Sequence, residues 1–372
     1  MRALGIILAG GNNNRMRELS NRRAIAAMPV AGSYRSIDFA LSNMTNSHIA
    51  KVAVLTQYNA RSLNEHLSSS KWWNFGRKQG GLFVFTPTIT PDNSFWYQGT
   101  ADAIYQNLDF LKRSHEPYVV IASGDCVYKL DYNKVLEYHI AKRADVTIVC
   151  KDVDANEDVT RFGVLRMNED YRIEEFEEKP MLSHYHTIST GIYVIRRRQL
   201  IEMIERCAQE GRHDFVKDIL IRYKNLKRIY GYKIQDYWNN ISTVEAYYKT
   251  NMDFLKPEVR DYFFRQYPGI NSKIDDLPPA KYNPGCLVKN SLVSSGCIIN
   301  GQVENSVLFK KVYVGNNCVI KNSIILNDVY LGDNTHIENC IVESRDTIRA
   351  NSYYCGEGEI KVVVEKNERY AL

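Results

Sequence analysis

The chain has 372 residues, enough for two domains at about 100–200 residues each, and 44% of its residues are hydrophobic. Its formal net charge is +5, from 48 basic and 43 acidic residues without a Lys/Arg block, and no apolar stretch approaches the roughly 20 residues that span a bilayer; we therefore expect neither a nucleic-acid partner nor a membrane segment. Its eight cysteines form no C-x-x-C pair, which argues against a zinc site or a disulfide framework and predicts free thiols in a cytoplasmic protein.

The first part of the chain alternates strand-like and helix-like segments. The short apolar runs 3–9, 52–55 and 118–122 are typical of buried parallel strands, and residues 101–112 carry apolar side chains at helical spacing. This alternation predicts a Rossmann-like α/β domain over residues 1–255, with a mostly parallel sheet and flanking helices. Ligands of such sheets bind beyond the carboxyl ends of the strands, so Gly10-Gly11 and Gly124-Asp125 should share one rim.

The loop after the first apolar run, residues 10–15, reads GGNNNR. A tight polar loop at this place can present backbone N–H groups to phosphates, and Arg15 adds a bidentate cationic group. Strand-to-helix turns also carry Gly and Asn for backbone reasons alone, and the two interpretations have about equal weight when the loop is taken by itself. The same glycines argue that the first apolar run belongs to the fold and not to a signal peptide.

The last third of the chain is repetitive. Residues 256–283 are predicted to be a linker, and residues 284–372 contain four copies of one pattern, which begin at Lys289, Glu304, Lys321 and Glu338, 15, 17 and 17 residues apart. Short apolar strands at this period predict a left-handed parallel β-helix, with aliphatic residues stacked inside and Asn or Gly at the corners. A β-sandwich with regular turns is the alternative. An edge of the β-helix could also support a homo-oligomer.

Eight segments follow one another in an order that is specific to one family: LAGGNNNRMREL, RRAIAAMPVAGSYRSIDFALSN, LTQYNARSLNEHL, WYQGTADAIYQN, SGDCVYKLDY, FEEKP, STGIYVI and DYWNNISTVEAYYKTNMDFL. Together they resemble bacterial ADP-glucose pyrophosphorylase (glucose-1-phosphate adenylyltransferase), over about residues 1–345. The resemblance implies a nucleotidyltransferase-like domain in which ATP and glucose 1-phosphate give ADP-glucose and pyrophosphate, with Mg²⁺. Such chemistry depends on positioning and charge neutralisation rather than on a covalent nucleophile.

Most of the residues that the resemblance assigns to the site are retained. Asp125 matches the first metal-binding aspartate, and Arg15 matches a catalytic position beside the phosphate-loop residues Gly10 and Gly11. The substrate positions are Gln57 for adenine, Tyr97, Gly99 and Thr100 for the segment that lines the site, Glu178, Lys179 and Ser189 for glucose 1-phosphate, and Lys217. Without the surrounding motif, Glu178-Lys179 would be interpreted as an ordinary exposed ion pair.

Three departures from the family pattern weaken the same electrostatic function. Asn13 replaces the third glycine of the phosphate loop, and its side chain hinders close approach of the backbone to phosphate. Ile25 replaces the phosphate-facing lysine and cannot offset triphosphate charge. Asn240 replaces the second metal aspartate, and its uncharged amide should hold Mg²⁺ weakly. Losing one well-placed group costs about 10²–10³ in rate, so we expect this chain alone to be weak or inactive.

A fourth departure concerns regulation, because the lysine that the family ties to activator binding is Ser33 in this chain. An effector response would then require other basic residues, with Arg35 and Arg22 as candidates and ordinary surface charge as the alternative. The set of departures resembles a regulatory, non-catalytic subunit that joins a catalytic subunit of ADP-glucose pyrophosphorylase, as a heterotetramer, in glycogen biosynthesis. The alternatives are a weakly active adenylyltransferase and a sensor that binds glucose 1-phosphate, ATP or ADP-glucose without chemistry.

Overall fold

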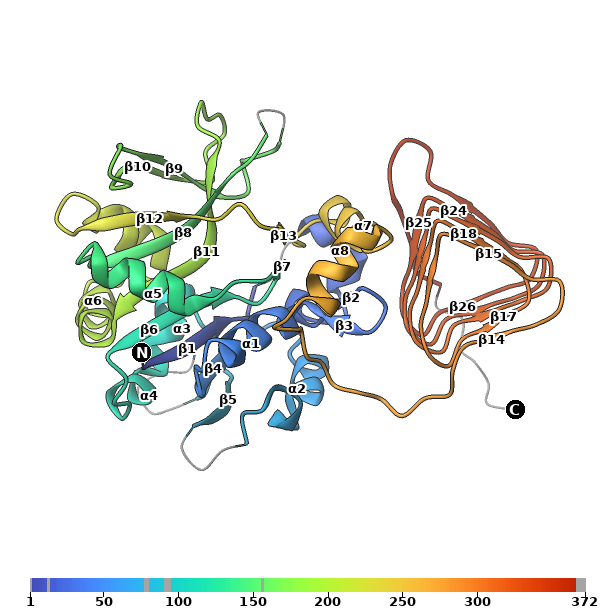
Figure 1. Ribbon diagram of the computed structural model, residues 1–372, viewed down its shortest axis with the longest axis horizontal. Helices are drawn as coiled ribbons and strands as arrows, with labels where there is room; N and C mark the ends of the chain where they lie inside the picture. The colour runs from blue at the N-terminus through green and yellow to red at the C-terminus, as the bar shows by residue number, and fades with distance from the viewer. Residues whose placement is uncertain (1, 12–13, 77–79, 90–94, 155–156, 366–372) are drawn as a thin grey trace.

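The computed structural model describes residues 2–11, 14–76, 80–89, 95–154 and 157–365. An N-terminal α/β domain and a C-terminal β-helix lie beside each other along the long axis of the molecule (Figure 1). The predicted fold class, an α/β domain with parallel strands followed by a left-handed parallel β-helix, is confirmed. Among the helices in these ranges, none combines the length and the apolar character that a bilayer crossing requires.

The α/β domain is built on one nine-stranded sheet, made of β1 (Ala3–Leu8), β4 (Lys51–Leu55), β5 (Gly81–Phe85), β6 (Tyr118–Ser123), β8 (Val146–Asp152), β9 (Gly163–Met167), β10 (Ile173–Glu178), β11 (Thr187–Arg196) and β12 (Ile229–Lys233). The strand order is β10-β9-β11-β6-β1-β4-β5, with β8 beside β11 and β12 beside β8. Strands β6, β1, β4 and β5 are parallel, whereas β11 is antiparallel to β6, β8 and β9. The carboxyl ends of β1, β4 and β6 therefore meet at one rim.

Helices cover both faces of this sheet. Alternate side chains of β1 point to opposite faces, so Ile7 packs in one apolar cluster, while Leu4 and Ile6 pack in the other. The first cluster is covered by α1 (Ser36–Asn46), α2 (Arg61–Leu67) and α5 (Tyr132–Ala141). The second is covered by α3 (Thr100–Gln106), α4 (Leu108–Lys112), α6 (Arg197–Gln209) and the short helix η4 (Val216–Ile221).

Further short elements lie outside the nine-stranded sheet, its covering helices and the β-helix. They are η1 (Asn14–Ser20), η2 (Ile25–Ala27), β2 (Pro29–Val30), β3 (Tyr34–Arg35), η3 (Ser70–Trp73), β7 (Cys126–Tyr128), β13 (Trp238–Asn240), α7 (Val244–Asp253), α8 (Pro257–Arg260) and η5 (Asp261–Arg265). The segment predicted as a linker, residues 256–283, begins with α8 and η5, and its Phe263 is fully buried. The first part of this segment therefore packs on the α/β domain, and the extended connection covers residues 266–280.

The β-helix consists of three five-stranded parallel sheets, one for each side of a triangular coil. The first sheet contains β14 (Lys281–Tyr282), β17 (Ile298–Ile299), β20 (Tyr313–Val314), β23 (Tyr330–Leu331) and β26 (Thr347–Ile348). The second contains β15 (Leu287–Lys289), β18 (Gln302–Glu304), β21 (Val319–Lys321), β24 (His336–Glu338) and β27 (Tyr353–Cys355). The third contains β16 (Leu292–Val293), β19 (Val307–Leu308), β22 (Ile324–Ile325), β25 (Cys340–Val342) and β28 (Lys361–Val363).

The corners of the coil are formed by residues with left-handed backbone. The predicted Asn corner is confirmed, since Asn290, Asn305, Asn322 and Asn339 all have φ between 42° and 52°. Asn290 Nδ2 also donates to Asn305 Oδ1 at 2.9 Å, so the corner carries a side-chain ladder. A second corner does not follow the predicted Asn or Gly rule: it consists of Lys311, Asp328 and Arg345, with φ of 59°, 60° and 64°.

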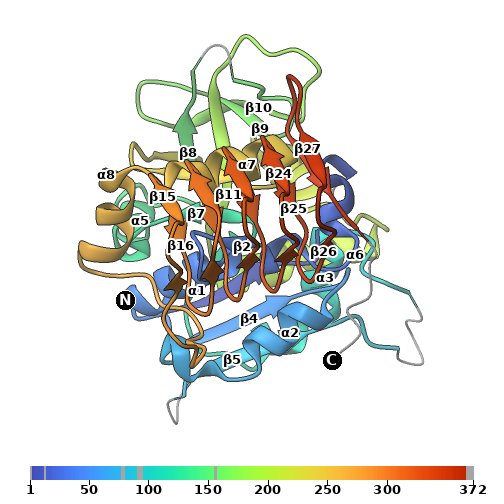
Figure 2. The ribbon, with the colours of Figure 1, turned by 90° about the vertical axis from the view of Figure 1, so that its right-hand side faces the viewer.

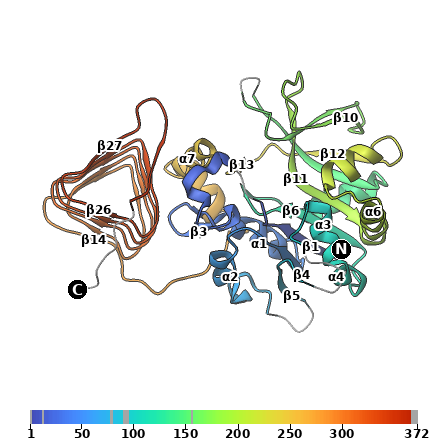
Figure 3. The same ribbon diagram turned by 180° about the vertical axis from the view of Figure 1, so that it is seen from behind.

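One side of the β-helix packs on the α/β domain through a third apolar cluster. Val307, Ile324 and Ile341 of the third β-helix sheet share this cluster with α7. Helix α7 lies behind the β-helix strands in Figure 2 and between the β-helix and the main sheet in Figure 3. The Tyr248 hydroxyl of α7 donates to the Asn322 carbonyl oxygen at 2.7 Å. The two domains thus meet through a packed interface in addition to the extended connection.

Candidate functional site

The glycine loop lies on the rim, beside the end of the neighbouring strand. A Cβ at Gly10 would lie 3.3 Å from the Gln57 Cβ, so the backbone at residue 10 approaches Gln57 closely, while the space around Gly11 is open. The Gly124 amide donates to the Leu8 carbonyl oxygen at 2.9 Å, which joins the ends of β1 and β6. The structure therefore brings Gly10, Gly11 and Gly124 to one rim, as the strand pattern predicted.

Gln57, predicted to recognise adenine, is joined by a pair of hydrogen bonds to Tyr97 of the segment predicted to line the site. The Tyr97 amide donates to Gln57 Oε1 at 2.7 Å, and Gln57 Nε2 donates to the Tyr97 carbonyl oxygen at 3.3 Å. The Tyr97 hydroxyl accepts from Asn107 at 2.9 Å, and burial raises its pKa. These bonds fix the orientation of the Gln57 amide, which is what base discrimination by hydrogen bonding requires.

The start of α3 is fixed to the segment that carries Lys217. A Cβ at Gly99 would lie 2.3 Å from the His213 carbonyl oxygen, so only glycine fits at this position. The Thr100 hydroxyl oxygen accepts from the Phe215 amide at 3.0 Å. Gly99 and Thr100 therefore position residues 213–217 as well as lining the rim.

The residues that the resemblance assigns to glucose 1-phosphate lie near one another. Glu178 Oε1 is 3.7 Å from Lys179 Nζ, and the Glu178 side chain is 13% exposed. Burial raises the pKa of the Glu178 carboxyl, and the positive charges of Lys179 and Lys217 oppose this shift. Ser189 is buried, with its hydroxyl 3.4 Å from the Tyr193 hydroxyl. Two cations and a shielded carboxylate thus flank this part of the cleft, an arrangement that suits a phosphorylated sugar.

Asp125 and Asn240 lie on either side of one thiol. Strands β7 and β13 are antiparallel and pair Cys126 with Asn240. The Cys126 Sγ is 3.5 Å from Asp125 Oδ1 and 3.6 Å from Asn240 Nδ2, and burial raises the pKa of this thiol. Asp125 Oδ1 also accepts from the Ser123 hydroxyl at 2.5 Å. The two predicted metal positions are therefore adjacent.

The donor set at these two positions fits Mg²⁺ poorly. Asn240 Oδ1 accepts from the Ser242 amide at 3.0 Å and from the Ser242 hydroxyl, so the amide oxygen that could ligate a cation is already occupied. Asp125 is then the one carboxylate of the pair. In the part of the chain that the structure describes, no three His, Cys, Asp or Glu side chains form a group that could hold a metal ion.

The other replaced positions have different surroundings. Ile25 is 4% exposed and packs in the apolar cluster that contains Met16, Leu19 and Val127. An aliphatic residue at position 25 thus contributes to the core beside the cleft. Asn13 lies outside the described residues.

Arg15, at the end of the phosphate loop, forms an ion pair with Asp158. Its Nη1 is 3.6 Å from Asp158 Oδ2, and both side chains are about half exposed. The charges of Arg15, Asp158 and Asp125 all act on Arg161, a residue that the sequence analysis did not select. Arg161 lies two residues before β9, and this position gave no separate signal of function.

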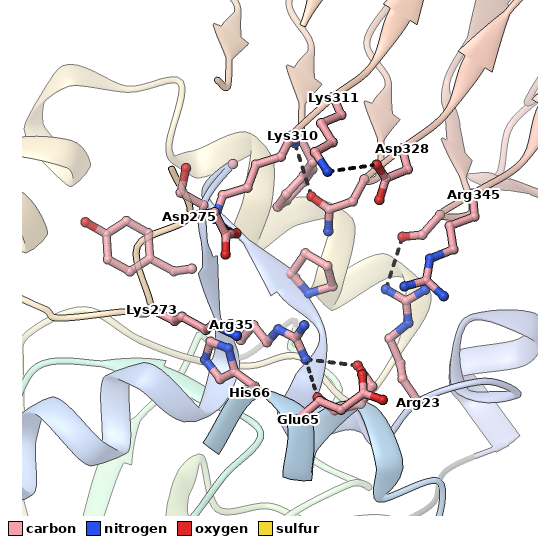
Figure 4. Close-up of a pocket in the computed structure, with 18 of the residues that line it drawn as sticks. Arg23, Arg35, Glu65, His66, Lys273, Asp275, Lys310, Lys311, Asp328 and Arg345 are labelled. Carbon is pink, nitrogen blue, oxygen red and sulfur yellow. Dashed lines mark hydrogen bonds and ion pairs between the residues drawn. The ribbon is translucent and has the colours of Figure 1, made fainter. Parts of the chain in front are cut away.

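A second candidate site is a strongly basic cavity of about 730 Å³ between the two domains (Figure 4). Its charged lining comprises the cations Arg22, Arg23, Arg35, Arg61, Lys273, Lys310, Lys311 and Arg345 and the acids Glu65, Asp275 and Asp328. Ser33 also lines it, and Lys311, Asp328 and Arg345 are the charged corner of the β-helix. We call this cavity the interdomain pocket.

Internal contacts hold several of these cations in place. Arg35 Nη1 donates to the Ser62 carbonyl oxygen at 2.8 Å, and burial lowers the pKa of Arg35. Lys310 Nζ donates to Asp275 at 2.8 Å. The eight cations outnumber the three acids, so the pocket favours an anionic ligand. Arg22 and Arg35, the predicted candidates for an effector response, both line this pocket.

Comparison with known proteins agrees with this arrangement. The sequence model of the nucleotidyl transferase family matches residues 4–257, and that of the GlmU-like C-terminal hexapeptide matches residues 278–357. The glucose-1-phosphate adenylyltransferase of Clostridium novyi is 38% identical over 320 residues, which cover 85% of this chain and 84% of the relative. Those of Clostridium perfringens and Geobacillus stearothermophilus are 40% and 38% identical, over 85% and 86% of this chain and 81% and 83% of theirs.

The fold and the rim residues define a nucleotidyl transferase with a hexapeptide-repeat tail. At this level of identity and coverage, the chain belongs to the glucose-1-phosphate adenylyltransferase family. The relatives are named as the enzyme itself.

Proposed function

We propose that this chain is a regulatory subunit of glucose-1-phosphate adenylyltransferase, impaired in catalysis, that acts in the cytoplasm with a catalytic subunit as a heterotetramer in glycogen biosynthesis. The observation that carries the proposal is the pair Asp125 and Asn240. The amide oxygen of Asn240 is engaged by Ser242, so one carboxylate remains to hold a divalent cation and offset the charge of the transferring phosphoryl group.

Electrostatic arguments support the impairment. Removing one well-placed charge-stabilising group typically costs about 10²–10³ in rate. Ile25 supplies no cation at a second position, although effects within one coupled site do not simply add. The sugar-phosphate side of the cleft, with Glu178, Lys179 and Ser189, is retained, so binding of glucose 1-phosphate should persist while phosphoryl transfer is slow.

The interdomain pocket supports the regulatory part of the proposal. Lys311, Asp328 and Arg345 adopt a left-handed backbone at its wall, a conformation that Asp tolerates but that is unfavourable for Lys and Arg. Sequence-local folding alone would favour Asn or Gly there. Charged side chains at these positions are consistent with recognition of an anionic effector, whose binding would be communicated to a catalytic partner.

The test combines this chain with a catalytic subunit from the same organism. Pyrophosphate release from ATP and glucose 1-phosphate is measured for each protein alone and for the mixture, and the assembly is followed by size-exclusion chromatography with light scattering. We expect little turnover by this chain alone, and a mixture whose turnover or effector response exceeds that of the catalytic subunit. Brisk Mg²⁺-dependent turnover by this chain alone, or no association and no effect, would contradict the proposal.

A control separates regulation from assembly. Arg345→Gln removes a cation from the interdomain pocket, whereas Lys289→Gln removes one from an exposed pair with Glu304 at the outer side of the β-helix. Both variants should assemble, and only Arg345→Gln should change the effector response of the mixture. If this chain alone binds glucose 1-phosphate but shows no turnover of its own and does not change the turnover or effector response of the mixture, it is a sugar-phosphate sensor instead.

A weakly active adenylyltransferase is the second candidate, and the retention of Asp125 and Arg15 favours it. Turnover that belongs to this chain should disappear in Asp125→Asn, because that change removes the remaining carboxylate of the metal position. Turnover that is the same in Asp125→Asn would instead come from a contaminating enzyme.

A further inference from the structure

The turn at residues 158–162 contacts both the phosphate loop and the segment that follows β13. Asp158 reaches Arg15 of the phosphate loop, with 3.6 Å between Oδ2 and Nη1. Arg161 Nη1 reaches the Thr243 hydroxyl at 3.5 Å, three residues beyond Asn240. Arg161 therefore lies between the phosphate loop and the strand that carries the second metal position.

Packing fixes the Arg161 side chain in this place. Its guanidinium lies 4.7 Å from the centroid of the Phe162 ring, and that ring packs edge-on against Trp238 at 5.7 Å. The Phe162 carbonyl oxygen accepts from the Lys179 amide at 3.0 Å. The turn thus positions Arg161 and the backbone of Lys179 together, so a cation at residue 161 is coupled to the sugar-phosphate side as well.

The local charges form an arrangement that an anion would complete. Burial lowers the pKa of Arg161, the Asp158 carboxylate opposes this, and the like charge of Arg15 lowers the pKa further. Asp125 also acts on Arg161. Two guanidinium groups that repel each other and share a carboxylate would both gain from a bound phosphate, because charge-assisted hydrogen bonds from Arg to phosphate are strong and often bidentate.

We propose that Arg161 is an anion-contacting residue of the cleft, which donates hydrogen bonds to the phosphate oxygens of a bound nucleotide beside Arg15 and supplies a cation that position 25 lacks. The inference rests on the proposed function only in that the cleft binds phosphate-bearing ligands. It holds whether the chain is impaired or slowly active.

Binding of ATP, pyrophosphate and adenosine to the full-length protein tests the assignment by isothermal titration calorimetry. Arg161→Gln should weaken ATP and pyrophosphate by about tenfold or more, the value of one charge-assisted contact, and leave adenosine unchanged because adenosine carries no phosphate. Arg161→Lys should recover part of the loss, since it keeps the charge without the guanidinium fork. Excess adenosine should displace ATP, which assigns the signal to the cleft rather than to the interdomain pocket.

The matched control is Arg228→Gln, which removes an arginine that pairs with Asp145 at 3.2 Å and does not touch the cleft. If Arg161→Gln and Arg228→Gln weaken the binding of ATP and pyrophosphate equally, the effect comes from the change in net charge, and the inference is overturned. Parallel loss of adenosine binding would indicate a structural role and would also overturn it, as would a native chain that binds none of the three probes. Turnover in the mixture with a catalytic subunit reports on the proposed function separately.

Discussion

Breaking the buried ion pair between Arg23 and Glu343 should destabilise the contact between the two domains by about 3–5 kcal/mol, because one charge is left without its partner. Arg23 Nη2 donates to Glu343 Oε1 at 2.5 Å, and the side chains are 12% and 1% exposed. Glu343 Oε1 also accepts from the Ser344 amide at 2.6 Å. Among the described residues, no donor reaches Glu343 Oε2, so the carboxylate depends strongly on Arg23.

The perturbation is a double-mutant cycle of Arg23→Met and Glu343→Gln, followed by urea unfolding with probes in each domain. Arg23→Met should lower the free energy of unfolding by the full amount of about 3–5 kcal/mol, because it leaves the buried Glu343 carboxylate with the Ser344 amide as its remaining donor. Glu343→Gln should lose less, about 1–3 kcal/mol, because the amide oxygen still accepts from Ser344 and Arg23 is partly solvated. The double variant should lose less than the two single losses added together, which measures the coupling.

Two results would refute this reasoning. A loss below about 1 kcal/mol in Arg23→Met would mean that the pair behaves like an exposed salt bridge. Additive losses in the double variant would mean that the two side chains do not stabilise each other, whatever their distance. The control is Lys289→Gln, which removes a member of an exposed pair and should change stability by less than about 1 kcal/mol.

Three further predictions follow from single positions. Gly99→Ala should destabilise the protein by about 1–3 kcal/mol and weaken ATP binding, because the new Cβ would lie 2.3 Å from the His213 carbonyl oxygen. Thermal shift without and with ATP measures both effects, and an unchanged melting temperature would refute the close packing. Burial raises the pKa of Asp346 from 3.8 to about 6, so the native state binds this proton more tightly than the unfolded state and the protein loses stability as pH rises from about 4 to about 6. Asp346→Asn should therefore raise the melting temperature above about pH 6 and leave it unchanged below about pH 4. A difference in melting temperature that does not depend on pH would refute the shift. Asn240→Asp combined with Ile25→Lys and Asn13→Gly should restore some pyrophosphate release, and a triple variant without activity would mean that the site has other defects. Ile25→Lys alone should lower the melting temperature, because residue 25 is 4% exposed and the change buries a charge.

The features that could be predicted from the sequence are those with a local or periodic signal. The repeat of 15 and 17 residues predicted the β-helix, because each coil stacks on the next in register. In the structure Glu304 pairs with Lys321, and Lys321 pairs with Glu338. Asn corners were predictable because Asn tolerates left-handed backbone. The apolar runs gave the buried strands, and the turns that follow them gave the rim with Gly10 and Asp125.

What could not be predicted depends on contacts between segments far apart in the chain. The interdomain pocket forms where Arg35 and Arg61 meet Lys311 and Arg345, more than 240 residues later, and no local pattern records that docking. Helices α8 and η5 fell within the predicted linker because its turn signal, residues 275–279, gave no exact start for the segment, whereas burial of Phe263 holds these helices on the domain. Motif matching assigned position 25 to the cleft, and packing places the Ile25 side chain in the apolar cluster.

The short helix η2 connects the interdomain pocket with the metal position at Asp125. This connection leads to a last prediction. Arg23 lines the pocket and lies two residues before the start of η2. Ala26 of η2 packs so closely on Gly124 that a Cβ at Gly124 would lie 3.1 Å from the Ala26 Cβ. Gly124 precedes Asp125, and its amide donates to Leu8 at 2.9 Å. An anion that draws Arg23 away from Glu343 should shift η2 and change hydrogen exchange at the Gly124 amide. Because pyrophosphate is also proposed to bind beside Arg15 and Arg161, the comparison uses the Arg161→Gln background, in which that binding is weakened. We expect pyrophosphate to alter this exchange in Arg161→Gln and not in Arg161→Gln combined with Arg23→Met. Equal change in both variants would show that the route through η2 carries no coupling.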